Sequence, residues 1–209
     1  MFAAILFQLP VVLLPFANLP APPDACRLEV LSPQALEERT LADFEGRVSR
    51  YVTLHRRLER SVPPEQMFDD PEDMYAAVEA LRQALVEARP TARAGNIFTP
   101  AVARLLTDRV EEALHNQRLT LGDVLAGTSE GRLPGMPRPE VNQAFAWGYG
   151  SGIPPTLIAA LPALPVELEY RFVERTLVLV DLHADLVVDV IDDALPAVEP
   201  LTSDRRHVH

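Results

Sequence analysis

The most constraining feature of this sequence is a short run, residues 176–180, that is apolar on both of its alternating faces. Successive side chains of a β-strand point to opposite faces of its sheet, so a strand of this kind must be covered on both sides. Such a strand belongs in the middle of a sheet. The run therefore predicts that the C-terminal third of the chain forms a sheet with residues 176–180 at its centre.

The segments on either side of this run supply the neighbouring strands. Residues 168–173 alternate apolar and polar side chains, and residues 186–191 are again largely apolar. Glu174 and Arg175 are expected to form the turn between the first two strands, and residues 183–185 the turn between the last two. The simplest arrangement is a three-stranded antiparallel meander packed on helices. A helix over residues 184–195 is the alternative for the last segment.

Three prolines, each preceded by a residue that can cap a helix, mark helix starts in the first half of the chain. These pairs are Ser32-Pro33, Asp70-Pro71 and Thr99-Pro100. The first helix is expected to run to about Ser61, and its apolar residues recur at alternating steps of three and four, which indicates a narrow packing seam. The seam consists of Leu41, Phe44, Val48, Tyr51, His55 and Leu58. A short fourth helical piece is expected from Thr120.

These patterns predict an α+β protein, with an N-terminal helical bundle and a small C-terminal antiparallel β-meander. We divide the chain into a signal-like apolar segment (1–23), a helical domain (32–126), a connector rich in Gly and Pro (127–155), a β module (156–195) and a tail (196–209). The connector is expected to lie on the surface of a neighbouring element.

Residues 1–23 carry no charge and are almost entirely apolar, as the hydrophobic part of a secretory signal is. We therefore expect an exported protein, periplasmic or secreted, whose membrane contact is limited to this segment. The alternatives are a core segment of a cytosolic protein and a retained membrane anchor. Cys26 follows this segment, and we expect an unmodified thiol there rather than a lipidation site.

Composition excludes several classes of function. The formal net charge is −11, which argues against a nucleic-acid or anionic-membrane partner. All 19 basic residues are Arg, so chemistry that depends on Lys, such as a P-loop or a Schiff base, is excluded. The single Cys excludes an intrachain disulfide and a metal site with several Cys ligands.

Residues 154–171 read PPTLIAALPALPVELEYR, and LVLVD at 177–181 and LVVDVI at 186–191 follow. This succession of a Pro-rich lead-in, a Tyr-Arg strand, a hydrophobic strand ending in Asp, a turn and a last strand resembles the C-terminal module of RcnB-like periplasmic proteins. Those proteins are associated with nickel and cobalt homeostasis, and similar modules occur in uncharacterised exported bacterial proteins. The resemblance implies the small β module and a periplasmic location. It does not carry over a metal function.

Asp181, His183 and Asp185 form the most chemically suggestive pattern in the chain. Residues two apart on an extended strand project from one face, and an imidazole with two carboxylates suits a divalent cation. The alternative is a polar turn whose acids are solvated. Other acids and histidines follow in sequence, namely Asp189, Asp192, Asp193, His207 and His209.

Two further motifs and one histidine carry weaker signals. Ser129 lies in a G-x-S-x-G pattern, but no strand precedes it and prolines follow, so a nucleophile elbow is not expected. Residues 148–152 are rich in Gly yet lead into no helix that could hold a phosphate. His55 lies in the apolar seam of the first helix, where a buried, hydrogen-bonded histidine is the usual meaning.

We therefore expect a non-enzymatic exported protein that acts as a periplasmic or envelope-associated binding or accessory factor, with no catalytic residues and no required cofactor. Its partner is an unidentified protein or envelope component, and its oligomeric state is open. The first alternative is a periplasmic metal-binding or metal-homeostasis protein that uses Asp181, His183 and Asp185. The second is a small serine hydrolase that uses Ser129.

Overall fold

A computed structural model of the chain describes residues 32–62, 71–119, 122, 124, 137–146 and 153–195. The signal-like segment, Cys26, the Ser129 motif, the glycines at 148–152 and the C-terminal tail lie outside the described residues. The start of the expected fourth helical piece at Thr120 lies outside them as well.

The helices begin where the cap-and-proline pairs predict. Helix α1 is Pro33–Glu59, and the Ser32 side chain accepts a 3.2 Å hydrogen bond from the backbone N–H three residues further on. Helix α3 is Pro100–Gln117, and Thr99 accepts the equivalent bond at 3.4 Å. Such caps satisfy backbone donors that have no partner within the first helical turn.

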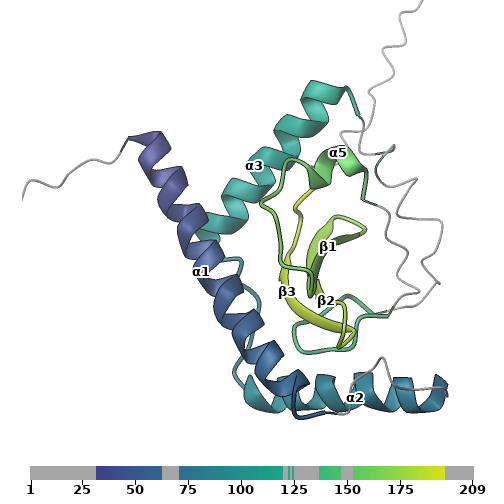
Figure 1. Ribbon diagram of the computed structural model, residues 1–209. Coiled ribbons are helices and arrows are strands. Elements are labelled where there is room, and N and C mark those ends of the chain that lie inside the picture. The colour runs from purple at the N-terminus through teal and green to yellow at the C-terminus, as the bar shows by residue number, and fades with distance from the viewer. Residues whose placement is uncertain are drawn as a thin grey trace, which may run out of the picture. The chain divides into compact units, whose positions relative to one another are not determined.

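Helix α2 is Pro71–Ala88 and carries Glu72 and Asp73 in its first turn. The carboxylates stabilise that end because the helix dipole is positive there. A short helix, α5 (Pro155–Ile158), precedes the sheet. Figure 1 shows α1 running along the side of the sheet, and α2 lies near the C-terminal end of α1. In the described part of the chain, no helix combines the length and the hydrophobicity that a transmembrane span requires.

The β-meander is confirmed. Strands β1 (Leu168–Val173), β2 (Thr176–Asp181) and β3 (Leu186–Ile191) form an antiparallel sheet in the order β1-β2-β3. The run that is apolar on both faces lies in the central strand, and five of the six residues of that strand, from Leu177 to Asp181, are completely buried. The alternative helix over 184–195 is wrong, because β3 pairs with β2 along this segment.

One face of the sheet and the helices share a single hydrophobic core. Leu177 and Leu179 of β2 face the helices and belong to the same cluster as Phe44 of α1. Phe44 stacks on Phe98, whose ring in turn stacks on Tyr170 of β1, with ring centroids 6.1 Å and 6.5 Å apart. Helices and sheet therefore depend on one another for burial, which confirms the α+β class and the packing of the meander on the helices.

The opposite face of the sheet packs against part of the connector. Phe145 is buried there in a second cluster with Val178 and Val180 of β2. Residues 142–145 also extend the sheet edge, because the backbone of Asn142 and Gln143 exchanges hydrogen bonds with Val187 of β3. This portion of the connector lies on a neighbouring element, as its composition indicated.

Candidate metal centre

Strand alternation decides where Asp181 points. Leu177 and Leu179 face the helices, so Asp181, two residues further along β2, faces them too. Its register partner on β3, Leu186, belongs to the same core cluster. Asp181 is consequently a carboxylate at the end of a core-facing row, and it is completely buried.

Four hydrogen bonds to this buried carboxylate come from the described residues. The Tyr51 hydroxyl donates to Oδ2 at 2.6 Å, and Nδ1 of His55 lies 2.6 Å from the same oxygen. The backbone N–H groups of His183 and Ala184 donate to Oδ1 at 3.1 Å and 3.0 Å. An ionised carboxylate can only accept, so the proton of the His55 contact is on Nδ1. Asp181 thereby joins α1 to the turn after β2.

His55 is oriented by this carboxylate through Nδ1, and its other ring nitrogen, Nε2, is not used in that contact. Its side chain is 0% exposed. Nε2 lies 3.5 Å from Oε2 of Glu59 but makes no well-formed hydrogen bond within the described part of the chain. Burial alone would lower the pKa of His55. The hydrogen bond to Asp181, together with the charges of Asp181 and Glu59, outweighs burial and raises that pKa.

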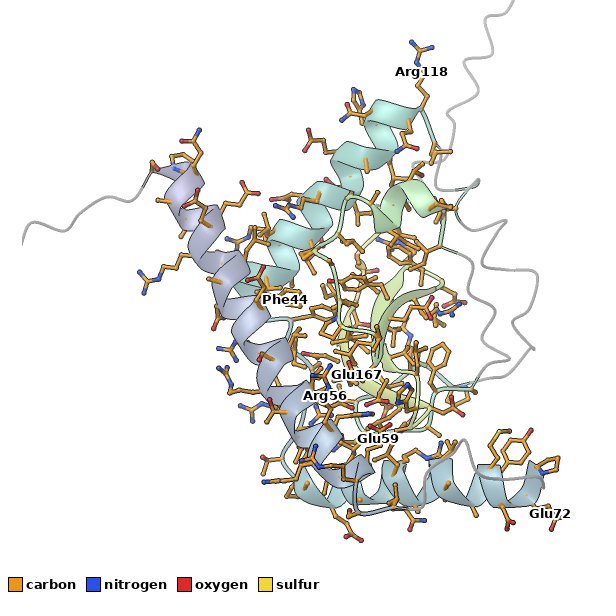
Figure 2. The ribbon with its side chains drawn as sticks, viewed as in Figure 1. Phe44, Arg56, Glu59, Glu72, Arg118 and Glu167 are labelled. Atoms are coloured by element: carbon orange, nitrogen blue, oxygen red, sulfur yellow. The ribbon has the colours of Figure 1, made fainter. Side chains whose placement is uncertain are left out.

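Glu59 and His183 complete a group of three side chains. Glu59 follows His55 by four residues on α1, so the two side chains share one face of the helix. His183, in the turn between β2 and β3, places Nδ1 2.7 Å from Oε1 of Glu59. One ligand atom from each of the three residues lies within 4.8 Å of the others. Figure 2 shows Glu59 on the part of α1 that borders the sheet.

A second ion pair lies next to this group. Arg56 donates to Glu167, just before β1, at 2.5 Å, and Figure 2 shows the pair bridging α1 and the sheet. Burial alone would raise the pKa of Glu167, but the Arg56 hydrogen bond and charge reverse this effect and lower it. The pair holds α1 against the strand edge one helical turn from Glu59.

The sequence pattern Asp181, His183 and Asp185 does not form a site as a unit. Asp181 uses both oxygens on protein donors, and Asp185 is the left-handed residue of the turn, with φ 45°. Only His183 belongs to the group that could hold a metal. Of these three residues, His183 is the one that lies close to two other possible ligands, His55 and Glu59.

The neighbouring acids have other roles. Asp189 is buried and accepts the backbone N–H groups of Gly95, Ile97 and Phe98 at 2.6–2.9 Å, which fixes the loop before α3. Asp192 and Asp193 follow the far end of β3, where they contact Thr176 and Arg175. His207 and His209 lie outside the described residues.

Sequence reasoning placed His55 in a packing seam and went no further. The structure confirms that His55 is buried and hydrogen-bonded. The signal that could have found the site was the spacing of His55 and Glu59, since an i, i+4 pair on a helix presents two ligands on one face. The contribution of His183 depends on tertiary packing.

This arrangement has the chemistry of a metal-binding histidine. A histidine that binds a metal through one nitrogen almost always donates its other N–H to a carboxylate or carbonyl, which fixes the ring and its tautomer. Asp181 does this for His55, and it leaves Nε2 directed toward Glu59 and His183. Two imidazoles and one carboxylate form a set that zinc and similar ions accept.

Comparisons with protein families, with curated proteins and with solved structures found no match to this chain. The resemblance to RcnB-like proteins is therefore still a prediction. Inference about function rests on the geometry of the described residues.

Proposed function

We propose that this protein binds a divalent transition-metal ion of the zinc or nickel class through His55, Glu59 and His183. The observation that carries the proposal is Nε2 of His55. It is buried, lacks a well-formed hydrogen bond in the described part of the chain, and is directed by Asp181 toward two other ligand groups. A buried polar atom without a partner is costly, and a metal ion would give it one.

The donor set favours this class of ion over calcium or magnesium. Calcium and magnesium take oxygen ligands, whereas imidazole nitrogen suits zinc, nickel, copper and iron. The lack of Cys ligands among the three residues does not weaken the site, because sites with two His and one Glu are an established zinc pattern.

The three residues need only a small movement to close around an ion. Ligand atoms around tetrahedral zinc lie about 3.3 Å apart, given zinc–nitrogen distances near 2.0–2.1 Å. The atoms here lie within 4.8 Å of one another. The side chains of Glu59 and His183 are 40% and 37% exposed, so both can move toward a His55 that packing holds in place.

A simple ion-pair network is the competing interpretation. In that state a protonated His55 interacts with Asp181 and Glu59, in keeping with its raised pKa, and His183 pairs with Glu59 at the surface. A metal ion must displace the proton on Nε2 of His55, so the two states compete for the same atom. Measured metal affinity separates them.

We further propose a binding role for the protein, outside the cytoplasm, rather than a catalytic one. The location is supported only by the uncharged apolar sequence of residues 1–23. The binding role is supported by a ligand set assembled from two elements that the core already holds together.

The test is isothermal titration calorimetry of the full chain with ZnCl2, NiCl2 and CaCl2. The background protein carries His207→Ala and His209→Ala, which removes adventitious binding at the tail. We expect one zinc or nickel ion per chain, no calcium binding, and loss of binding in His183→Ala. Because His183 and Glu59 form a half-exposed pair, His183→Ala should cost less than about 1 kcal/mol of stability.

His115→Ala is the matched control, since His115 is an exposed histidine at the end of α3, away from the group. It should bind metal as the background protein does. Absence of zinc and nickel binding, or equal loss in His115→Ala and His183→Ala, would contradict the proposal.

A further inference from the structure

A pocket on the side of α1 that carries Tyr51 has an unusual lining for so acidic a chain. It has a volume of about 380 Å³ and lies between α1 and the segment that joins α2 to α3. Three of its ten lining residues are arginines, Arg47, Arg50 and Arg89, and none is acidic. The whole chain has a net charge of −11, so three guanidinium groups around one cavity are a local reversal of charge.

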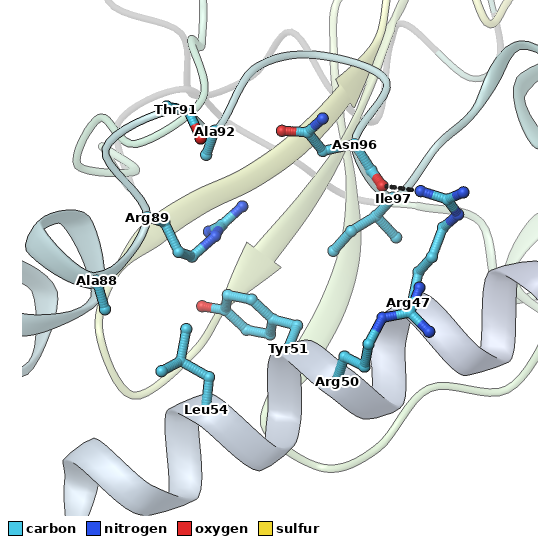
Figure 3. A pocket seen from close by; sticks show the side chains of 10 residues that line it. All are labelled: Arg47, Arg50, Tyr51, Leu54, Ala88, Arg89, Thr91, Ala92, Asn96 and Ile97. Carbon is cyan, nitrogen blue, oxygen red and sulfur yellow. Dashed lines mark hydrogen bonds between the residues drawn. The ribbon is translucent and has the colours of Figure 1, made fainter.

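Arg89 forms one wall of the pocket. Its guanidinium lies 4.8 Å from the centre of the Tyr51 ring, and Nη2 donates to the carbonyl of Val188 at 3.0 Å. Nη1 is buried and makes no hydrogen bond within the described residues. Figure 3 shows the guanidinium extending over Tyr51 toward the space bordered by Asn96 and Arg47. Part of the donor capacity of this cation is therefore unused.

Arg47 and Arg50 approach from α1. Arg47 donates through Nη1 to the carbonyl of Asn96 at 2.8 Å and through Nε to Asp43, so its position is fixed at the rim. Arg50, one residue before Tyr51, is exposed and lines the same pocket. A guanidinium group presents a planar fork of donors that fits the two oxygens of a carboxylate or phosphate.

We infer that this pocket binds a small oxyanionic ligand, a carboxylate or phosphate group, through Arg47, Arg50 and Arg89. An oxyanion in the pocket would place a negative charge and further acceptors beside Arg89, whose Nη1 has no hydrogen-bond partner among the described residues. The stack on Tyr51 keeps Arg89 in place, and Tyr51 is itself fixed by its bond to Asp181. The volume lies within the range of pockets that hold small ligands.

This inference is independent of the metal site. The three arginines line a pocket to which none of His55, Glu59 and His183 contributes. Binding is therefore measured on protein stripped of metal with a chelating resin, in buffer without soluble chelator, because EDTA is itself a polycarboxylate and would compete for the pocket. His183→Ala, which removes a proposed metal ligand, should bind the anion as wild type does.

The experiment is calorimetric titration of the full chain with inorganic phosphate and, separately, with succinate. The variant is Arg50→Gln, because Arg50 is exposed and its replacement leaves the core intact. The control is Arg57→Gln, because Arg57 is also an exposed arginine on α1 and does not line the pocket. The two titrants distinguish a phosphate from a carboxylate preference.

We expect saturable binding of at least one titrant at one site per chain. Loss of a charge-assisted hydrogen bond weakens binding by about tenfold or more, so the dissociation constant of Arg50→Gln should rise by that factor. Arg57→Gln should stay within about twofold of wild type, the small effect usual for a distant surface charge. No saturable binding of either anion, or equal weakening in both variants, would overturn the inference.

Discussion

Replacing Asp181 by Asn changes one atom of the side chain and tests how the buried carboxylate works. The carboxylate accepts four hydrogen bonds, two from side chains of α1 and two from the backbone of the turn after β2. Asparagine keeps one acceptor oxygen. If that oxygen keeps the two hydrogen bonds from the backbone N–H groups of the turn, the amide NH2 group faces the donors of Tyr51 and His55.

The magnitude follows from these contacts. Hydrogen bonds to a charged group contribute about 1.5–3 kcal/mol each, and neutral ones about 0.5–1.5 kcal/mol. The Tyr51 hydroxyl can rotate to accept, and His55 can accept at Nδ1 by moving its proton to Nε2. Two charge-assisted bonds then become two neutral ones, so Asp181→Asn should lower the free energy of unfolding by about 2–4 kcal/mol.

The same proton shift affects metal binding. With its proton on Nε2, His55 presents no lone pair toward Glu59 and His183, so zinc affinity should fall by about 10- to 100-fold, as for other losses of a carboxylate behind a metal-binding histidine. Urea unfolding gives the stability, and calorimetric zinc titration of the folded variant gives the affinity. Circular dichroism at the titration temperature confirms that the variant is folded.

Asp185→Asn is the matched control. Asp185 lies in the same turn with a φ of 45°, a conformation that asparagine adopts readily, and it is not part of the metal group. Its stability should change by less than about 1 kcal/mol and its zinc affinity should stay the same. The reasoning is refuted if Asp181→Asn keeps wild-type zinc affinity, or if Asp185→Asn loses as much affinity.

Three further predictions concern the fold. Phe44→Ala should destabilise the protein by about 3–5 kcal/mol in urea unfolding, because Phe44 is buried in the shared core, and a wild-type midpoint would contradict this. Leu179→Pro should abolish cooperative unfolding by removing a donor from the central strand, whereas Leu179→Val should fold. Glu167→Gln should be destabilising above pH 4.5, the ordinary pKa of glutamate. Pairing with Arg56 lowers the pKa of Glu167 in the folded protein. The difference in free energy of unfolding between variant and wild type should therefore disappear as the pH falls through that lowered pKa, and a difference that does not change with pH would contradict this prediction.

Local signals predicted most of the fold. Ser32 and Thr99 form caps at the predicted helix starts, and the run after Thr176 became the central strand. The cover of the second sheet face was only partly predictable. Phe145 lies in a segment rich in Gly and Pro without periodicity, and its burial depends on pairing with β3, which is a long-range contact.

The candidate site was predicted only in part for a similar reason. Spacing placed Asp181 and His183 together, but it could not show that Asp181 faces inward and contacts Tyr51 and His55 of α1 through Oδ2. Nothing in the sequence marked Glu59 as a possible ligand, because a glutamate near the end of a helix is usually solvated. The group exists because the turn after β2 meets the last turns of α1, which are more than a hundred residues away in sequence.

We propose above that His55, Glu59 and His183 hold one metal ion. The most direct test of this proposal is diffraction from crystals of the full chain grown with ZnCl2, with anomalous data collected on both sides of the zinc absorption edge. We expect one dominant zinc peak about 2.0–2.2 Å from Nε2 of His55, a Glu59 oxygen and a His183 nitrogen. A dominant peak elsewhere, with the bond between His183 and Glu59 intact, would contradict the account.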